Sequence, residues 1–275
     1  MIVGVDMGAT TTRIGYVKKG EVYEKRTLST PKRKHEILST LSRLIDLYEK
    51  KSALCLGIAA FMHEGRAVHT PNMDFSDVSL ASILTKRYRQ PVYVDNDADC
   101  AGLGELVYGH GKGRKNFVLL TLGTGIGGAI IINGELYRGS SFAGEVGQII
   151  IEGKRLEERA SGTAARKLAP SYGLAGYSNY GIEVLSKKGD RRALNLYQHI
   201  GTWLGLGLLN ISYVVDPEVF IIGGGFSHAR AVLERAQRTL QEKDVIGRGL
   251  KVLHAYLGDN AGLIGASLLP QHYWK

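Results

Sequence analysis

Apolar and polar positions along the chain follow two patterns that alternate from one end to the other. Short, nearly continuous apolar runs are typical of buried strands, and longer segments with apolar residues at helical spacing are typical of helices. The runs predict strands at 1–8, 12–17, 21–29, 54–61, 91–97, 117–123, 128–133, 135–139, 218–225 and 251–258. The second pattern predicts helices at about 34–51, 78–89, 98–108, 161–169, 192–215, 227–243 and 261–269. Pro270 is expected to stop the last helix. Interleaved strands and helices predict an α/β fold.

The order of predicted elements begins again near the middle of the chain. The segment 6–23 (DMGATTTRIGYVKKGEVY) can be set beneath the segment 121–137 (TLGTGIGGAIIINGELY). Each has a polar residue two positions before a glycine, turns through small residues into an apolar strand, and reaches Gly-Glu-apolar-Tyr. Two halves that open alike indicate a duplicated domain with a cleft between the copies. The expected domains are 1–95 plus 261–275, and 96–260.

The second copy opens with four glycines, Gly123, Gly125, Gly127 and Gly128. Glycine backbone can approach a phosphate because no Cβ stands in the way, and a tight hairpin turn is the alternative. The run fits G-x-G-x-x-G, but a dinucleotide-binding fingerprint opens a helix, whereas the residues AIIING that follow continue as a strand. The other motifs of protein kinases are absent.

Composition excludes several classes of protein. No uncharged apolar stretch in the 275 residues reaches the roughly 18 that a membrane span needs, and the N-terminus does not resemble a signal peptide. Cys55 and Cys100 cannot by themselves build a disulfide framework or a four-ligand zinc site. We therefore expect a cytoplasmic protein with reduced core thiols and no membrane partner. The net charge of +9 is spread over short groups such as 32–34. This favours a solvated basic surface that attracts an anionic substrate over a nucleic-acid partner.

Five motifs, in order along the whole chain, resemble those of the ROK family of sugar kinases and sugar-responsive repressors. They are GVDMGATTTRIGYV, VDNDADCAGLGE, the stretch 122–148, EVFIIGGG and LGDNAGLIGAS. The resemblance implies two actin-like (ribonuclease-H-like) domains of the actin/hexokinase/Hsp70 fold with an interdomain cleft. It also implies a homodimer that uses ATP and Mg²⁺ to phosphorylate the primary hydroxyl of a free hexose. Glucose-like or allose-like sugars are the first candidates, and N-acetylmannosamine is the next.

The matched loops supply the candidate nucleotide ligands. Backbone N–H groups and hydroxyls of the first loop suit phosphate oxygens, and Asp6 could hold Mg²⁺ directly or through water. A turn-forming role is the alternative for Asp6. The candidates are Asp6, Gly8, Ala9, Thr10, Thr11 and Thr12 in the first loop, Thr121, Gly123, Thr124 and Gly125 in the second, and Gly223, Gly224 and Gly225 after the adenosine strand.

Asp97 lies where a predicted strand ends and a helix begins, so the helix dipole should keep its carboxylate ionised. An ionised carboxylate suits a general base that accepts the proton of the sugar hydroxyl, and a helix cap is the alternative. Asn96 can orient the sugar ring by hydrogen bonds. Asp99 points elsewhere along the helix, so it is not expected to be the base.

The resemblance makes Glu145 and Glu157 acceptors for sugar hydroxyls, with a surface glutamate as the alternative for Glu157. Asn72, in TPNMD, is a further candidate for the sugar pocket. His63 and His69 are expected to be loop or surface residues.

One departure from the family pattern concerns zinc. Gln148 stands where the family has a zinc-ligating histidine, and Arg155 stands where it has a cysteine. Only IIIEGKRL separates Gln148 from Glu157, so the family's cysteine-rich loop is missing. Joint loss of the ligands predicts that the protein binds no structural zinc. Gln148 can still hydrogen-bond a sugar hydroxyl.

A sugar-sensing regulator without catalysis is the alternative function. Repressors of the family carry a helix-turn-helix domain before the kinase-like part, and here the first phosphate loop motif begins at residue 2. Intact phosphate loops and Asp97 favour the kinase.

Overall fold

The computed structural model describes residues 1–49 and 51–272. Residue 50, in the helix expected at 34–51, and residues 273–275, in the expected first domain, lie outside the described residues. The chain divides into two compact units. The first unit comprises Met1–Gly113, Ala129–Gly144 and Asp259–Lys275, and the second comprises Arg114–Gly128 and Glu145–Gly258.

The first sheet has the strand order β3-β2-β1-β4-β7. Its strands are β1 (Ile2–Met7), β2 (Thr11–Lys18), β3 (Glu21–Ser29), β4 (Ala53–Ile58) and β7 (Val92–Asn96). The strands β1, β2 and β3 form an antiparallel meander, and β4 and β7 extend it in parallel with β1. β1 carries apolar side chains on one face (Val3, Val5 and Met7, all fully buried) and the small Gly4 and the acidic Asp6 on the other.

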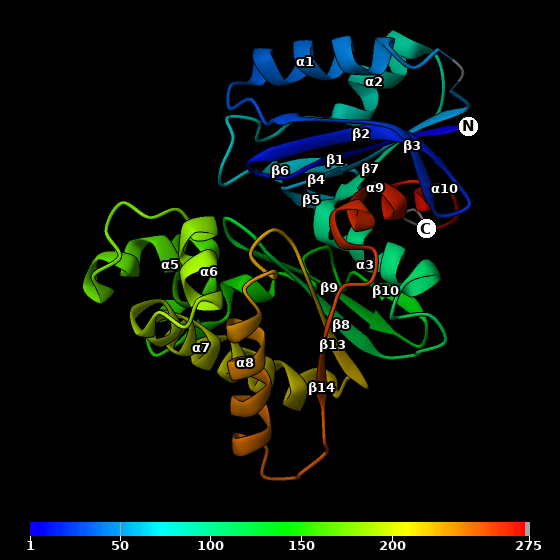
Figure 1. Cartoon of the computed structure of the whole chain (residues 1–275). Helices are drawn as coiled ribbons and strands as arrows, with labels where there is room; N and C mark the ends of the chain where they lie inside the picture. The colour runs from blue at the N-terminus through cyan, green and yellow to red at the C-terminus, as the bar shows by residue number, and fades with distance from the viewer. Residues whose placement is uncertain (50, 273–275) are drawn as a thin grey trace. The chain divides into compact units, whose positions relative to one another are not determined.

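Helices cover both faces of this sheet (Figure 1). α1 (Lys34–Asp46) and α2 (Leu80–Tyr88) share a buried apolar cluster with Val3, Val5 and Met7. α3 (Asp97–Tyr108) and α9 (Ala261–Ala266) pack on the opposite face. The packing there is close, because a Cβ on Gly4 would lie 2.8 Å from the Leu263 carbonyl oxygen and one on Gly265 would lie 1.5 Å from that of Cys100. Only glycine fits at these two positions.

Three further short elements of the first unit are β5 (Phe61–His63), β6 (Arg66–His69) and α10 (Leu269–His272). β5 and β6 form a hairpin. The prediction that Pro270 stops the last helix is wrong. α9 already ends at Ala266, and Pro270 lies in the first turn of α10, where its missing N–H costs nothing.

The second sheet has the order β10-β9-β8-β13-β14. Its strands are β8 (Phe117–Leu122), β9 (Ile126–Ile132), β10 (Glu135–Tyr137), β13 (Val219–Gly223) and β14 (Lys251–His254). β9 and β10 are antiparallel, whereas β13 is parallel to both β8 and β14. This order repeats that of the first sheet, with β8 in the place of β1. The predicted α/β architecture built on two equivalent sheets is confirmed.

The second unit also contains several helices. They are α4 (Leu156–Ala160), α5 (Gly162–Leu168), α6 (Asn179–Lys187), α7 (Arg191–Val215) and α8 (Arg230–Lys243), with a small hairpin of β11 (Ile150–Ile151) and β12 (Lys154–Arg155). Short 3₁₀ turns occur at Val146–Gln148 and Ala169–Tyr172, and another at Gly258–Asn260 begins the return to the first unit. No helix within residues 1–49 and 51–272 is both long and apolar enough to cross a membrane.

The domain boundary expected between residues 95 and 96 stays a prediction, and it does not coincide with an end of the first compact unit. The first compact unit includes α3, because this helix packs against α9 and β4.

Candidate active site

Asp6 lies at the end of β1 beside the first turn of α9. A Cβ on Gly262 would lie 2.7 Å from the Asp6 Cγ, so the chain of α9 directly covers the carboxylate. Arg13 places Nη1 3.5 Å from Asp6 Oδ2 and Nη2 3.3 Å from Asp259 Oδ2. The pKa of Asp6 is raised to about 7, chiefly by burial and then by the charge of Asp97, and Arg13 opposes the change. A cation at this carboxylate would offset the cost of its burial.

The first glycine loop connects β1 to β2 and is held by hydrogen bonds. Gly8 N donates to the Thr11 carbonyl at 3.0 Å, and Thr30 N donates to the Thr10 carbonyl at 2.9 Å. Thr30 Oγ1 donates to the Gly8 carbonyl at 2.8 Å and lies 2.9 Å from Thr12 Oγ1. Thr12 is buried, so its hydroxyl anchors the loop to Thr30, whereas Thr10 is exposed.

Asn96 and Asp97 begin α3. Asn96 is its N-cap: Oδ1 accepts from the N–H groups of Ala98 at 2.7 Å and of Asp99 at 3.1 Å. Its Nδ2 donates to the Ala60 carbonyl at 2.9 Å. The capping role weighed for Asp97 therefore falls to Asn96, whose side chain is largely committed to protein contacts.

Asp97 lies close to the first glycine loop. A Cβ on Gly8 would come within 3.9 Å of Asp97 Oδ2, and the charge of Asp97 contributes to the raised pKa of Asp6. Asp97 is half-buried and Asp99 is buried. The first unit thus brings Asp6, Gly8 and Asp97 together.

A buried ion pair, which the sequence did not predict, lies next to Asn96 and Asp97. Asp95 is fully buried, and its Oδ2 lies 2.6 Å from Arg138 Nη2. Burial raises the pKa of Asp95, and the Arg138 guanidinium opposes the rise. Asp95 Oδ1 also accepts from the backbone N–H of Asn96 at 2.9 Å. The sequence VDND showed that an acidic residue precedes Asn96, but it did not show that this residue, Asp95, pairs with Arg138.

The β5–β6 hairpin and the loop after it carry the other candidates of the first unit. Asn72 is exposed in this loop. His63 and His69 are exposed, as expected, yet His63 Nδ1 lies 2.5 Å from Ser141 Oγ. Ser141 has a φ of 150°, which favours glycine, so the His63 contact helps to hold a strained backbone.

The second unit brings together Glu145, Gln148 and Glu157. Gln148 Nε2 donates to Glu157 Oε1 at 3.2 Å, and the Ile126 N–H lies 3.5 Å from Glu157 Oε2. A Cβ on Gly125 would lie 2.5 Å from Glu157 Oε2, so a larger residue there would displace the Glu157 carboxylate. Burial raises the pKa of Glu145 to about 7, and the charge of Glu157 adds to the rise. Glu157 is half-buried, so it is not the exposed surface glutamate that was the alternative.

The second glycine loop packs against the segment that follows β13. Gly123 N donates to the Gly125 carbonyl at 3.0 Å, and Gly162 N donates to the Gly123 carbonyl at 2.9 Å. Gly224 has a φ of +85°, and a Cβ there would lie 2.4 Å from the Leu122 carbonyl oxygen. Thr121, Thr124, Gly223 and Gly225 belong to the same two segments.

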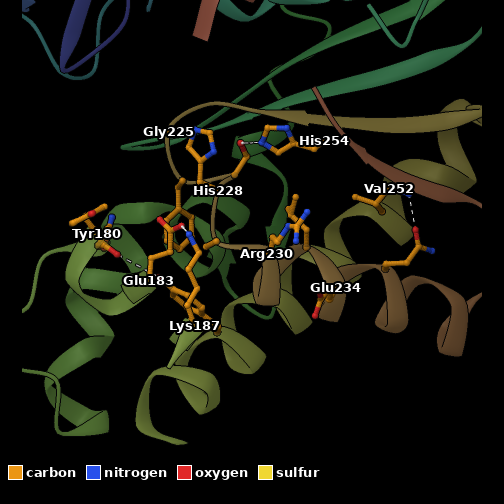
Figure 2. A pocket seen from close by; sticks show the side chains of 16 residues that line it. Tyr180, Glu183, Lys187, Gly225, His228, Arg230, Glu234, Val252 and His254 are labelled. Carbon is orange, nitrogen blue, oxygen red and sulfur yellow. Dashed lines mark hydrogen bonds and ion pairs between the residues drawn. The ribbon is translucent and has the colours of Figure 1, made fainter. Parts of the chain in front are cut away.

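A cavity of about 1110 Å³ adjoins Gly225 in the second unit. Side chains of α6, α7 and α8 line it together with residues 225–229 (Figure 2). His254 Nε2 lies 3.0 Å from Ser227 Oγ, and the His228 ring is 5.4 Å from that of His254. Phe226 packs edge-on against Tyr197 at 6.0 Å. The cavity thus has aromatic rings and polar groups suited to a flat heteroaromatic ligand.

The donor set decides which metal fits. Among the described residues, no three His, Cys, Asp or Glu side chains converge to hold an ion. Mg²⁺ usually takes one or two carboxylates together with substrate phosphates, and Asp6 with Asp97 nearby fits that pattern. Burial raises the pKa of Cys55 to about 12, so this thiol is protonated, unlike a cysteine ligand of zinc.

Residues 2–272 match the model of the ROK family. The chain belongs to the ROK family. A glucokinase of Halalkalibacterium halodurans is 33% identical to it over 97% of this chain and 94% of that protein. The crystal structure of a ROK family glucokinase from Streptomyces griseus in complex with glucose and AMPPNP has a TM-score of 0.90 and 29% identity, covering 98% of each chain. The xylose repressor of Bacillus subtilis is 31% identical over 76% of this chain and 58% of the repressor. These similarities confirm the predicted actin-like fold.

Proposed function

We propose that this ROK-family protein is an ATP-dependent kinase that phosphorylates the primary hydroxyl of a free hexose. The similarity to glucokinases over nearly the whole chain carries the proposal, because it includes the relative solved with glucose and an ATP analogue. The placement of Asp97 beside the first glycine loop supports it.

In this proposal Asp97 is the general base. The hydroxyl oxygen of the sugar bonds to the γ-phosphorus, its proton passes to Asp97, and the bond between that phosphorus and the β–γ bridging oxygen breaks to release ADP. Asn96 acts mainly by capping α3, and this fixes the backbone of its neighbour Asp97. Asp95 and Arg138 stabilise the strand end from which both residues project.

The nucleotide is proposed to use the cavity beside Gly225 for adenosine and the two glycine loops for its phosphates. His228 and Phe226 offer aromatic surface to the base. Asp6 would hold the Mg²⁺ that neutralises the β- and γ-phosphates when it is bound. The sugar is proposed to contact Glu145 and Glu157, with Gln148 holding the Glu157 carboxylate and Asn72 as a further contact.

The sugar and the donor can be tested by a coupled ATP-consumption assay over glucose, allose, mannose and N-acetylmannosamine. Turnover is expected with glucose or allose, and the N-acetylated sugar is the next candidate. Sugar binding without turnover on any of them would favour a regulator. A regulator should bind duplex DNA and retard its migration in a gel. Added sugar should then weaken this retardation. Light scattering on the 30.0 kDa chain tests the proposed homodimer.

A further inference from the structure

Neither glycine loop contains a basic residue. The segments 6–12 (DMGATTT) and 121–128 (TLGTGIGG) provide backbone N–H groups and hydroxyls but no lysine or arginine. Phosphoryl transfer spreads negative charge over the phosphoryl oxygens, and nucleotide sites commonly offset it with a cationic side chain as well as the metal. If the protein is a kinase, we expect that cation to come from another segment.

The segment that follows β3 lies directly against the first loop. Thr30 binds this loop through its N–H, at 2.9 Å from the Thr10 carbonyl, and through Oγ1, at 2.8 Å from the Gly8 carbonyl. Two residues later, Lys32 Nζ donates to the Ala9 carbonyl. The ammonium group is therefore held at the loop by a neutral acceptor.

The backbone of Lys32 is fixed from its other side. Asp74 N donates to the Lys32 carbonyl at 2.8 Å, and Arg33 forms an isolated bridge with Asp74. Asp74 is two residues from Asn72, the candidate sugar contact. Within the first unit, Lys32 thus lies between the first glycine loop and the loop that carries Asn72.

Lys32 is also available for a phosphate. Arg13, which directly follows the first glycine loop in the chain, forms ion pairs with Asp6 and Asp259. Within residues 1–49 and 51–272, Lys32 forms no ion pair with a carboxylate. A phosphate oxygen would replace a neutral acceptor with a charged one, so both partners of the hydrogen bond would carry charge, which strengthens it.

We propose that Lys32 is a phosphate-binding residue that contacts the γ-phosphoryl group of ATP and, after transfer, the phosphate of the sugar product. This inference rests on the proposed kinase function. It assigns the cation to the segment after β3, which none of the five motifs includes.

The test compares Lys32→Gln with Lys32→Arg and with the matched control Lys34→Gln, a neighbouring exposed lysine at the start of α1. K32Q should weaken binding of Mg²⁺-AMPPNP and lower kcat/KM for ATP by about 10- to 100-fold, the range expected for a hydrogen bond to a charged group. Binding of ADP, which has no γ-phosphate, should change less than twofold. K32R should recover most of the loss, and K34Q should behave as wild type.

The outcomes separate this inference from the kinase proposal. Equal weakening of AMPPNP and ADP would mean that Lys32 only shapes the loop, and an unchanged AMPPNP affinity would exclude the contact; either result overturns the inference. Absence of turnover in the wild type would count against the kinase, while the AMPPNP and ADP affinities would still decide on Lys32. Melting temperatures of all three variants check that they are folded.

Discussion

Asp97 and Asp99 are two residues apart and face different surroundings. Asp97 is half-buried next to Gly8 and contributes to the raised pKa of Asp6. Asp99 is buried within the packed face of α3. About half a helical turn therefore separates a carboxylate at the candidate site from one in the interior.

Replacing Asp97 with Asn keeps the size of the side chain and removes the proton acceptor. We expect kcat to fall by roughly 10²- to 10⁴-fold while the sugar still binds. Steady-state kinetics and calorimetry measure the two quantities. Asp99→Asn is the control: because Asp99 is buried, its melting temperature can fall, but the kcat of the folded variant should stay near that of wild type. A larger loss of kcat in D99N than in D97N would reverse the assignment.

Glu145 should make sugar binding depend on pH. Burial raises its pKa to about 7, so this carboxyl is neutral below that pH and ionised above it. An ionised carboxylate accepts hydrogen bonds from sugar hydroxyls, and affinity is expected to rise as the pH increases from 6 to 8. Calorimetric titration at several pH values should show this rise in wild type and a flat profile in Glu145→Gln.

The same group affects the stability of the sugar-free protein with the opposite sign. Because the folded state holds the proton of Glu145 more tightly than the unfolded state, its contribution is present below the unfolded pKa of 4.5 and is lost as the pH rises through about 7. The melting temperature should fall more between pH 6 and 8 in wild type than in E145Q. Identical pH profiles for the two proteins would show that Glu145 is not perturbed.

At the scale of elements, glycines decide how closely the helices approach. α7 carries Gly201 and Gly205 one turn apart, facing α8. A Cβ on Gly201 would lie 2.6 Å from the Val232 carbonyl oxygen, and one on Gly205 would lie 2.7 Å from that of Ala236. Backbone atoms cannot move aside as side chains can, so the crossing of α7 and α8 depends on these two residues.

Gly205→Ala should therefore destabilise the protein although alanine favours helix. We expect a loss of roughly 1–3 kcal/mol in the free energy of unfolding, the usual cost of overpacking. Gly181→Ala in α6 is the matched control, because its Cβ would approach side-chain atoms only and none closer than the Tyr177 ring, at 3.3 Å; it should be neutral or slightly stabilising. Urea unfolding measures both. Equal stability of the two variants would contradict the close crossing.

At the scale of the whole molecule, each passage of the chain from one compact unit to the other occurs directly after a glycine. The last residues before the passages are Gly113, Gly128, Gly144 and Gly258. Gly113 and Gly144 have φ values of +80° and +97°, which other residues rarely adopt. Glycine is therefore conformationally favoured at these two junctions and at Gly258, whose φ is +51°, whereas Gly128 lies within β9.

We expect the whole molecule to need Mg²⁺ for activity and no zinc for folding. A zinc chelator such as phenanthroline should leave folding and activity unchanged, because Gln148 and Arg155 stand where zinc ligands would be. EDTA should abolish activity by removing Mg²⁺ from the nucleotide, and added Mg²⁺ alone should restore it. Stoichiometric zinc in the purified protein, together with loss of structure on its removal, would disprove the inference drawn from the short segment between Gln148 and Glu157.

Periodicity sufficed for most long elements and failed for the short ones, and the nine-residue helix α6 was also missed. The strand expected at 21–29 is observed as β3 with the same bounds, and the helix expected at 192–215 is α7, one residue longer. α4, β11 and β12 were not predicted, because segments of two to five residues are too short to show a period. The last helix ends at Ala266 rather than at Pro270, although Leu268 and Leu269 still lie in the same buried apolar cluster as Cys100 and Leu103 of α3.

By itself the sequence determined the family, the duplicated strand order and the carboxylates to consider, because these depend on local patterns and on motifs in a fixed order. Only the tertiary structure decided the partners of those side chains. It pairs Gln148 with Glu157, assigns the cap of α3 to Asn96, joins Asp95 to Arg138 and brings Lys32 to Ala9. Two of these four contacts, Asp95 with Arg138 and Lys32 with Ala9, join residues far apart in the chain, and all four depend on side-chain geometry. No local pattern records such contacts, since burial and distance arise only when the strands and helices pack.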